Sequence, residues 1–182
     1  MYNPYVVGKL VYLRHPSEED ALGNWHEWFS DEEITKNLAD RFWPNSKESQ
    51  LQFVKLLGDK RKLVLSVVTT NSDKHIGVVS LSSINWVHRF ADVAIVIGDK
   101  EFRKGVYSVE AFGLILKVAF VRLNLKTVKS LYLKSNDASR MLHRVFKFIP
   151  VGELKDIFFI NGHYENVVIE MLDQESWVKR NL

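Results

Sequence analysis

The chain contains no cysteine among its 182 residues. Disulfide scaffolds, thiolate nucleophiles and cysteine-based metal sites are therefore excluded, and a cytosolic setting fits. The chain also has no apolar run that approaches membrane-spanning length. Its first residues, Met1–Tyr5, lack the charged and apolar regions of a signal peptide. We therefore expect a soluble, cytoplasmic protein that has no membrane partner.

Concentrated charge and the common nucleotide-binding motifs are absent as well. The 25 Lys and Arg residues are interleaved with 22 Asp and Glu residues, and the formal net charge is only +3. Because there is no basic block, we expect no nucleic-acid partner. The Walker and Gly-x-Gly-x-x-Gly patterns do not occur. The six histidines show no recognisable metal-ligand spacing, so we expect no metal.

The residues that are present have the balance of a globular protein, with 46% hydrophobic and 26% charged residues. The length favours one domain over residues 1–182. Five Trp, six Tyr and eleven Phe are many for such a chain. We therefore expect aromatic side chains to line either the core or a pocket.

The order of predicted elements favours a mixed α/β (α+β) fold. Capped starts followed by apolar residues at helical spacing predict helices, and runs rich in Val, Ile, Leu and Thr predict strands. A strand, a helix and a further strand in the middle of the chain predict a crossover. Strands are predicted at 9–14, 63–70, 76–84, 92–97, 127–133, 158–160 and 167–172, and helices at 17–29, 45–57, 106–120 and 136–148.

The segment 92–120 is the most informative part of the sequence. An apolar run at 93–97 predicts a buried strand, and apolar residues at helical spacing predict a helix from about Val106. The basic turn 103–108 lies between them. Because the first backbone N–H groups of a helix favour an anion, a phosphate-bearing cofactor would suit this turn. The alternative is an ordinary strand-to-helix turn with solvated cations.

Three local patterns stand out: the basic turn 103–108, the pair Asn136-x-x-Ser139 and Lys147-Phe148, and the hairpin 81–92 that ends at Asp92. Together with the element order they resemble the GCN5-related N-acetyltransferase (GNAT) superfamily, particularly its ribosomal-protein alanine and amino-sugar acetyltransferases, over nearly the whole chain. The resemblance implies a central, twisted, mostly antiparallel sheet that is splayed at the cofactor site and flanked by about four helices. It also implies acetyl-coenzyme A as cosubstrate. Backbone N–H groups of the splayed strand, which carries Ile95 and Ile97, would then stabilise the oxyanion of acetyl transfer.

The first pattern is the family's pyrophosphate-binding turn, Arg/Gln-x-x-Gly-x-Gly/Ala, whose backbone amides hold the cofactor. Val106 stands where the family prefers Gly, and Ser108 stands at the Gly/Ala position. The resemblance assigns cofactor binding to Arg103, Lys104, Gly105, Val106, Tyr107 and Ser108.

The second pattern is Asn136-x-x-Ser139 followed by Lys147-Phe148, which resembles the family's Asn-x-x-Ser/Ala helix ending in Gly-Phe. The resemblance implies that Asn136 and Ser139 bind the cofactor. Seven residues after Asn136, where relatives often use Tyr to protonate the leaving thiolate, the chain has His143. An imidazole can do that work because its pKa lies near neutrality. The alternative is a surface or hydrogen-bonded helix histidine.

The third pattern, residues 81–92, resembles the hairpin where this branch often has Arg-x-Ala-Glu, and Asp92 takes the acidic place. The attacking amine must be neutral, so Asp92 would remove a proton directly or through water. The alternative is a strand-start carboxylate that makes a turn hydrogen bond.

The early helices and this hairpin are expected to shape the acceptor pocket. Residues 28–35 are similar to a segment of family members linked to nucleotide-activated amino sugars, and aromatic faces stack on sugar or base rings. The alternative for the aromatic residues is the apolar face of the first helix. The candidates for substrate binding are Trp28, Phe29, Asn85, Trp86, His88 and Arg89.

Three functions follow from the resemblance. The first is acetyl transfer from acetyl-coenzyme A to a primary amine of an amino sugar, free or nucleotide-linked, or of another small molecule. The second is acetylation of a protein N-terminus, as on a ribosomal protein. The third is a non-catalytic binding module of the same fold. The partner is therefore expected to be a small-molecule amine, and a homodimer is an open option.

Overall fold

Eight strands form one sheet in the order β1-β2-β3-β4-β5-β6-β8-β7. The computed structural model describes residues 1–38, 43–103 and 105–181. Neighbouring strands pair antiparallel except β5 and β6, which are parallel. This confirms the predicted mixed fold with a mostly antiparallel sheet. The strands are β1 (Val6–Val7), β2 (Val11–Arg14), β3 (Leu63–Thr69), β4 (His75–Asn85), β5 (Phe90–Ile97), β6 (Thr127–Leu133), β7 (Ile149–Ile160) and β8 (His163–Asp173).

Of the helices in the described residues, four have eight or more residues. This agrees with about four expected helices, but the members differ. The first predicted helix is divided into short segments because Gly23 takes a non-helical ψ of −145°. The helix at the C-terminal end, α7, was not predicted. The α-helices are α1 (Glu18–Asp20), α2 (His26–Trp28), α3 (Glu32–Thr35), α4 (Lys47–Lys55), α5 (Gly105–Lys117), α6 (Asp137–Phe146) and α7 (Gln174–Asn181); π-helical segments (Ala21–Trp25 and Val118–Arg122) and a 3-10 turn (Lys100–Phe102) complete them.

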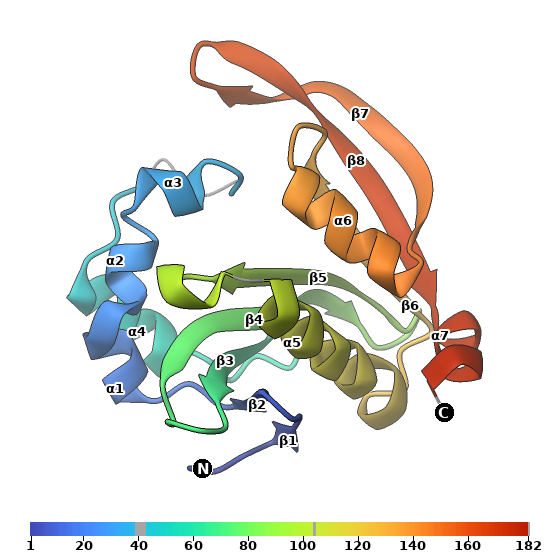
Figure 1. Cartoon of the computed structure of the whole chain (residues 1–182). Helices are drawn as coiled ribbons and strands as arrows, with labels where there is room; N and C mark the ends of the chain where they lie inside the picture. Colours follow the sequence, from blue (N-terminus) through green and yellow to red (C-terminus); the bar gives the residue numbers. More distant parts are fainter. Residues whose placement is uncertain (39–42, 104, 182) are drawn as a thin grey trace.

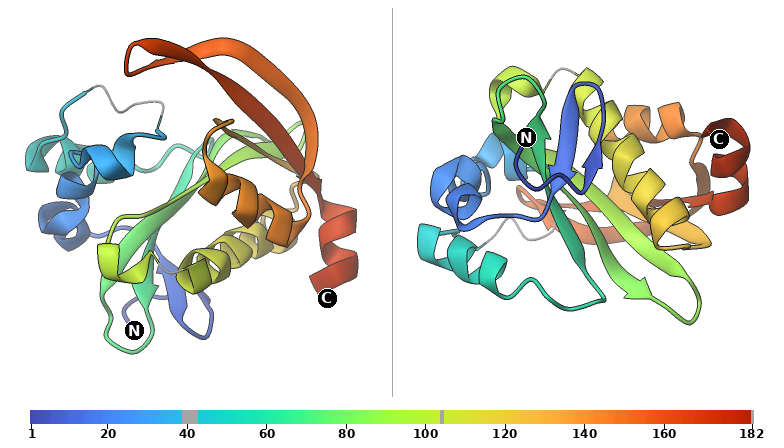
Figure 2. Two further views of the ribbon diagram at one scale, coloured as in Figure 1. Left: turned by 45° about the horizontal axis from the view of Figure 1, so that its top comes forward. Right: turned by 90° about the horizontal axis from the view of Figure 1, so that it is seen from below.

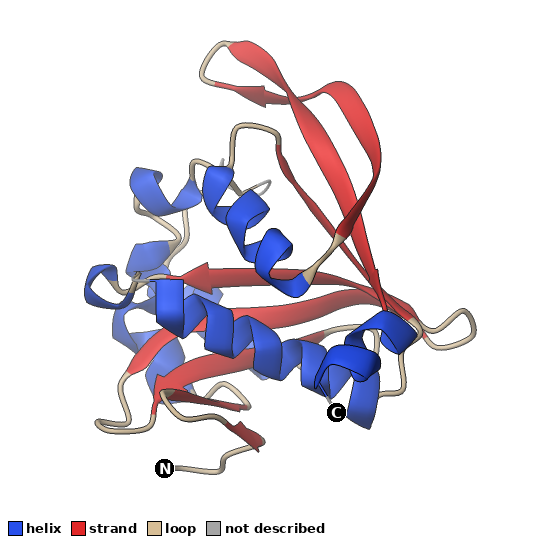
Figure 3. Cartoon of the chain, turned by 45° about the vertical axis from the view of Figure 1, so that its right-hand side comes forward, coloured by secondary structure: helices blue, strands red, loops and turns tan. Residues whose placement is uncertain are grey.

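The helices lie on both faces of the sheet. Helix α5 packs along one face, where Phe112, Ile115 and Leu116 are buried in the main core (Figure 3). The early helices α1, α2 and α4 lie on the opposite face, over a smaller core (Figure 2). Helix α6 lies beneath the long β7–β8 hairpin, which arches over the molecule (Figure 1). The middle strands of the sheet therefore have the main core on one face and the smaller core on the other.

Strands β5 and β6 run side by side only briefly. Three residue pairs join Phe90–Asp92 to Thr127–Lys129, and the pairing then stops. Strand β5 continues to Ile97 alongside β4, whereas β6 continues to Leu133 alongside β8. The edge of β5 that faces β6 is therefore left without a strand partner over residues 93–97.

A buried ion pair holds the first helical segment on the sheet. The Arg14 guanidinium donates to both carboxylate oxygens of Asp20, at 2.6 and 2.7 Å. Ser66 Oγ donates to Asp20 as well, at 2.7 Å, and Ser17 forms a capping box with it. The Asp20 residue is only 4% exposed. Since a buried carboxylate is stable only when its oxygens are satisfied, these contacts connect α1 to β2 and β3.

His75 extends this cluster towards the tryptophans of the first helical segments. Its Nε2 atom donates to the Gly77 carbonyl at 2.9 Å. Burial lowers the pKa of His75 to about 4, so the ring is neutral near pH 7. Its ring lies 5.6 Å from the Trp25 ring and 5.0 Å from the Trp28 ring. The cluster thus fixes the position of the aromatic residues that border one cavity of the protein.

Lys147, where the helix pattern predicted a family glycine, adopts the left-handed conformation, with φ 61° and ψ 38°. For a residue with a Cβ atom this conformation is strained, because Cβ comes too close to the following carbonyl oxygen. We predict that Lys147→Gly raises the free energy of unfolding by about 0.5–1 kcal/mol, because the strain relieved exceeds the entropy that Gly adds to the unfolded chain. Urea unfolding of the wild type and of Lys147→Gly measures this difference in the free energy of unfolding.

Arg144→Gly, three residues earlier, is the matched control. Arg144 lies within the right-handed part of α6, so Gly should lower the free energy of unfolding there by about 1 kcal/mol. Equal destabilisation by both substitutions would contradict the left-handed assignment at Lys147.

Candidate active site

A cavity of about 320 Å³ opens where β5 and β6 diverge. We call it the β5–β6 cavity. Its walls come from β5, β6 and the first turns of α5 and α6, with a contribution from the α3 region. The described residues that line it are Ile34, Asn37, Leu38, Val93, Ala94, Ile95, Val96, Ile97, Arg103, Ser108, Phe112, Ser130, Leu131, Tyr132, Asn136, Ala138, Ser139, Leu142 and His143.

The backbone of β5 presents N–H groups to this cavity. Gly98 donates its N–H to the Ile76 carbonyl at 3.0 Å. Because hydrogen-bonded and non-hydrogen-bonded pairs alternate along an antiparallel ladder, the N–H of Val96 also faces β4. The N–H groups of Ile95 and Ile97 therefore point away from β4, towards the edge that β6 has left. They are available to an anionic oxygen in the cavity.

The turn before α5 contributes a cation and a helix N-terminus. The Arg103 side chain lines the cavity and donates to the Gly98 carbonyl at 3.1 Å. Glu33 lies 3.5 Å from the same guanidinium and neutralises part of its charge. Ser108 also lines the cavity, and its hydroxyl donates to the Gly105 carbonyl at 2.9 Å. Lys104 was predicted to belong to this turn and lies outside the described residues.

The other predicted members of the turn do not line the cavity. The Val106 side chain is 58% exposed, so its branched atoms do not fill the space in front of the helix. Tyr107 packs edge-on against Phe102, with ring centroids 5.1 Å apart. A Cβ atom added at Gly105 would meet no other atom within 4 Å. The backbone N–H groups of these residues remain the groups that could bind an anion at the start of α5.

Helix α6 brings the second sequence pattern to the same cavity. Asn136 is its N-cap, and its Oδ1 atom accepts the Ser139 N–H at 3.1 Å. Both residues line the cavity. One turn later, His143 lines it too but is only 3% exposed. Its Nδ1 atom lies 2.9 Å from Oε2 of Glu170, a buried carboxylate of β8.

Asp92 lies on β5, two residues before Ala94 and therefore on the same face of the strand. Its Oδ1 atom is 2.5 Å from Lys129 Nζ, across the short parallel pairing of β5 with β6. Asp92 lines neither cavity among the described residues. The Asp92 carboxylate therefore does not contact a ligand in either cavity directly. A water molecule would have to connect it to a reacting amine.

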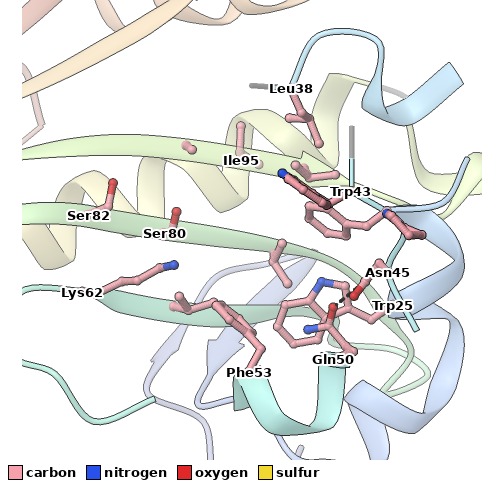
Figure 4. Close-up of a pocket in the computed structure, with 16 residues that line it drawn as sticks. Trp25, Leu38, Trp43, Asn45, Gln50, Phe53, Lys62, Ser80, Ser82 and Ile95 are labelled. Atoms are coloured by element: carbon pink, nitrogen blue, oxygen red, sulfur yellow. Dashed lines mark hydrogen bonds between the residues drawn. The ribbon is translucent and has the colours of Figure 1, made fainter. Parts of the chain in front are cut away.

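A second cavity, of about 470 Å³, lies on the opposite face of β5. We call it the aromatic cavity. Figure 4 shows Trp43 and Phe53 over it, with Ser80, Ser82 and Ile95 on the strands. The cavities share Leu38 and residues 94–96 of β5. The described residues lining it are Trp25, Phe29, Leu38, Trp43, Pro44, Asn45, Gln50, Phe53, Lys62, Val64, Val78, Ser80, Ser82, Ala94, Ile95 and Val96.

Three nitrogen groups at the aromatic cavity can donate hydrogen bonds, beside the hydroxyls of Ser80 and Ser82, which can donate or accept. Lys62 is the one charged residue in the described lining, and its ammonium lies 4.7 Å from the Phe53 ring centroid. The Gln50 carbonyl accepts from Asn45 at 2.9 Å, whereas its Nε2 atom is buried without a partner. Trp25 Nε1 is likewise buried without a partner. Trp25 was among the aromatic residues that the sequence offered for the acceptor pocket, whereas Lys62 and Gln50 had no signal there, because α4 and the start of β3 meet only in the fold.

The predicted substrate residues of the β4–β5 hairpin lie elsewhere. Trp86 donates its ring N–H to the Lys60 carbonyl at 3.0 Å. Arg89 donates to the backbone oxygen of Asn124 at 2.8 Å and to its side-chain oxygen at 2.7 Å. Asn85 accepts the N–H of His88. None of these four hairpin residues lines either cavity among the described residues, because the chain turns away from β5 there.

The aromatic residues on the short helical segments after α1 have two different roles. Phe29 lines the aromatic cavity. Trp28 does not, since its indole lies directly over Gly98, where an added Cβ atom would come within 1.9 Å of the ring. Trp28 is buried in the smaller core. The structure therefore places Trp28 in the packing that the sequence left open as an alternative, and Trp25 in the cavity wall.

Membrane-spanning helices and metal-binding clusters are both absent from the parts of the chain that the structure describes. No helix there is both long and apolar enough to span a bilayer. No group of three or more His, Asp or Glu side chains is placed to hold a metal ion.

Residues 11–148 match the family model described as Acetyltransferase (GNAT) domain. Spermidine N(1)-acetyltransferase of Escherichia coli (strain K12) is 33% identical over 102 residues, covering 56% of this chain and 54% of that protein. The chain spans about half the length of the curated relatives it matches.

Solved structures resemble the whole fold. Spermidine N-acetyltransferase from Vibrio cholerae, in complex with CoA and spermine, has a TM-score of 0.86 at 23% identity, covering 94% of this chain and 99% of that chain. The ribosomal L7/L12 alpha-N-protein acetyltransferase RimL, in complex with coenzyme A, has a TM-score of 0.83 at 17% identity, covering 96% and 99%. At these identities the likeness is one of fold.

Proposed function

The chain belongs to the acetyltransferase (GNAT) domain family, and from this premise we propose that it transfers the acetyl group of acetyl-coenzyme A to a primary amine. The observation that carries the proposal is the meeting of two cavities on β5. The β5–β6 cavity and the aromatic cavity share residues 94–96. A thioester held in the first cavity and an amine held in the second would meet there.

The residues of the β5–β6 cavity fit a phosphate-bearing cofactor. Arg103 and the N-terminal turn of α5 offer positive charge and backbone N–H groups to a pyrophosphate. The unpaired N–H groups of Ile95 and Ile97 point into the space left by β6 and would stabilise the oxyanion that forms during transfer. Acetyl-coenzyme A supplies the activated acyl group. Asn136 and Ser139 border the same space at the start of α6.

The aromatic cavity supports an acceptor that carries a ring and hydrogen-bond acceptors. Trp43 and Phe53 offer aromatic faces to a sugar or base ring. The buried N–H groups of Trp25 and Gln50 lack partners, and each would gain a hydrogen bond from a ligand oxygen. Lys62 adds a positive charge. These features favour an amino sugar that bears negative charge, such as a sugar phosphate or a nucleotide-linked sugar.

A polyamine is the second candidate, because curated relatives at 30–33% identity are named spermidine N(1)-acetyltransferases. A polyammonium ion has N–H donors but no acceptors, and carboxylates are the partners that bind it most strongly. The described lining of the aromatic cavity contains no Asp or Glu and does contain Lys62. We therefore rank polyamines below anionic amino sugars. A protein N-terminus and a non-catalytic role rank lower, since no described feature favours them.

The attacking amine must lose a proton before or during transfer. Asp92 remains our candidate for removing it through a water molecule, since it lies on the face of β5 that borders the aromatic cavity. Its ion pair with Lys129 holds the carboxylate in place. Deprotonation in bulk solvent is the alternative route.

We predict that Ala94→Phe abolishes most acetyl transfer without unfolding the protein. Ala94 is exposed and borders both cavities, so a ring there would separate thioester from amine. With acetyl-coenzyme A and glucosamine 6-phosphate, we expect thiol release by the wild type and at least a tenfold lower rate for the variant. Val87→Phe, at the 84% exposed hairpin tip, is the control. Full activity of Ala94→Phe would contradict the shared junction.

A separate prediction concerns the acceptor. Lys62→Glu should lower kcat/KM for glucosamine 6-phosphate by about tenfold and raise it for spermidine, because the charge at the cavity changes sign. Lys62→Met, which keeps most of the side-chain volume, should lower the first rate less and leave the second almost unchanged. If the wild type acetylates spermidine faster than the sugar phosphate, the anionic acceptor is wrong and the polyamine takes its place.

A further inference from the structure

Glu170 is a buried acidic side chain that no sequence pattern singled out. It lies in β8 between Ile169 and Met171 and is only 7% exposed. A carboxylate in such a position is costly unless it is paired. Its partner is His143 of α6, whose Nδ1 atom is 2.9 Å away. The pair spans the contact between α6 and β8, at the wall of the β5–β6 cavity.

Aromatic rings fix the His143 ring in its plane. Phe148 stacks on it, with centroids 4.8 Å apart and planes at 21°. Tyr132 meets it edge-on at 4.9 Å, and Phe112 lies at 5.8 Å. These contacts hold the ring in place, and Nδ1 is paired with Glu170. Only the second ring nitrogen is therefore free to exchange a proton with a ligand. That nitrogen, Nε2, makes no hydrogen bond within the described residues, while His143 lines the cavity.

The protonation of the ring follows from these contacts. An ionised carboxylate only accepts hydrogen bonds, so the hydrogen of a neutral imidazole lies on Nδ1 and the Nε2 lone pair is free. Burial lowers the pKa of His143, against the opposing effect of Glu170, so the neutral ring predominates near pH 7. Such a ring accepts a proton at Nε2 and cannot donate one there until it has done so.

We propose that Glu170 is a positioning residue, which holds His143 as the Nδ1–H tautomer and thereby presents Nε2 to the β5–β6 cavity as a proton acceptor. The tautomer is a property of the protein without ligand and does not depend on its function. The catalytic consequence rests on the proposed acetyl transfer. In that reaction His143 is a proton shuttle and not an acid that must start out charged.

The proton balance of the step is closed. The ammonium group of the acceptor first loses one proton, through water to Asp92 or to bulk solvent. The neutral amine nitrogen then forms the new C–N bond to the carbonyl carbon, and the second proton that this nitrogen loses moves to Nε2 of His143. The resulting imidazolium is stabilised by Glu170 at Nδ1. As the C–S bond breaks, the Nε2 proton moves to the sulfur. The products are an amide and a thiol, and His143 is neutral again.

Other charged groups near the pair belong to α6 and β6. Burial, the charge of Glu170 and a hydrogen bond to Glu170 together raise the pKa of Tyr132 to about 12, so Tyr132 stays protonated. The positive charges of Arg140 and Arg144, both on α6, lower the pKa of Tyr132 and so offset part of this increase. Glu170 is thus the acidic group that faces the imidazole, and Tyr132, Arg140 and Arg144 complete its titratable surroundings.

The first test reads the tautomer from the nitrogen-15 and proton NMR signals of the His143 ring in the protein without ligand at pH 7.5. We expect a protonated Nδ1 and an unprotonated Nε2. In Glu170→Gln the amide can donate to Nδ1 as well as accept from it, so we expect the Nε2–H tautomer to gain population. An Nε2–H ring in the wild type, or an unchanged ring in Glu170→Gln, would overturn the proposal.

Kinetics then test the catalytic consequence. Glu170→Gln should lower kcat by about 10- to 100-fold with KM for acetyl-coenzyme A unchanged. Tyr132→Phe leaves the Glu170–His143 contact in place and should keep the wild-type tautomer. Glu165→Gln, on the same strand but outside the lining of both cavities, is the control. Unchanged kcat in Glu170→Gln despite an altered tautomer would overturn the shuttle.

The pH profile separates a shuttle from an acid. Because the shuttle needs a neutral ring, kcat should be level from neutral to alkaline pH and fall only as His143 becomes protonated in acid. A rate that falls as pH rises through neutrality would show that the charged ring is required and would overturn the proposal. If the wild type transfers no acetyl group to any amine, the proposed function fails, while the NMR result still decides the tautomer.

Discussion

The divergence of β5 from β6 is the constraint on which the rest of the site depends. Two parallel strands that pair over three residues and then separate leave backbone N–H groups without partners. Such groups are costly in a protein interior unless a ligand or water satisfies them. Strand β6 is drawn away by its long pairing with β8, while β5 stays with β4. The β5–β6 cavity, the outward N–H groups of Ile95 and Ile97 and the junction of the two cavities all follow from this separation.

The two faces of β5 then provide different chemistry. On one face, α5 and α6 bring a helix N-terminus, Arg103 and the His143–Glu170 pair to a narrow space. On the other, the buried Arg14–Asp20 pair holds the first helical segment, which carries aromatic residues to the cavity wall. Under the proposed function, the cofactor and the acceptor would therefore be bound by separate elements. Only a short stretch of β5 is common to both.

Much of the fold could be predicted because local signals were strong. The strand at 127–133 is matched residue for residue, and the N-caps Ser17, Ser46 and Asn136 lie within one residue of the predicted helix starts at 17, 45 and 136. The site was harder. The cofactor turn is contiguous in sequence, but the acceptor cavity and the His143 partner join side chains from distant elements. Glu170 looked like one polar residue in an apolar strand, and nothing local pointed to Lys62 or Gln50.

The most direct test of the central claim is amide hydrogen exchange of β5 with and without acetyl-coenzyme A. The N–H groups of Ile95 and Ile97 should exchange faster than that of Val96 in the free protein, because Val96 is bonded to β4. Acetyl-coenzyme A should slow the first two and leave Val96 unchanged. Slow exchange of all three without ligand, or no change on adding it, would contradict an open β5 edge that binds the cofactor.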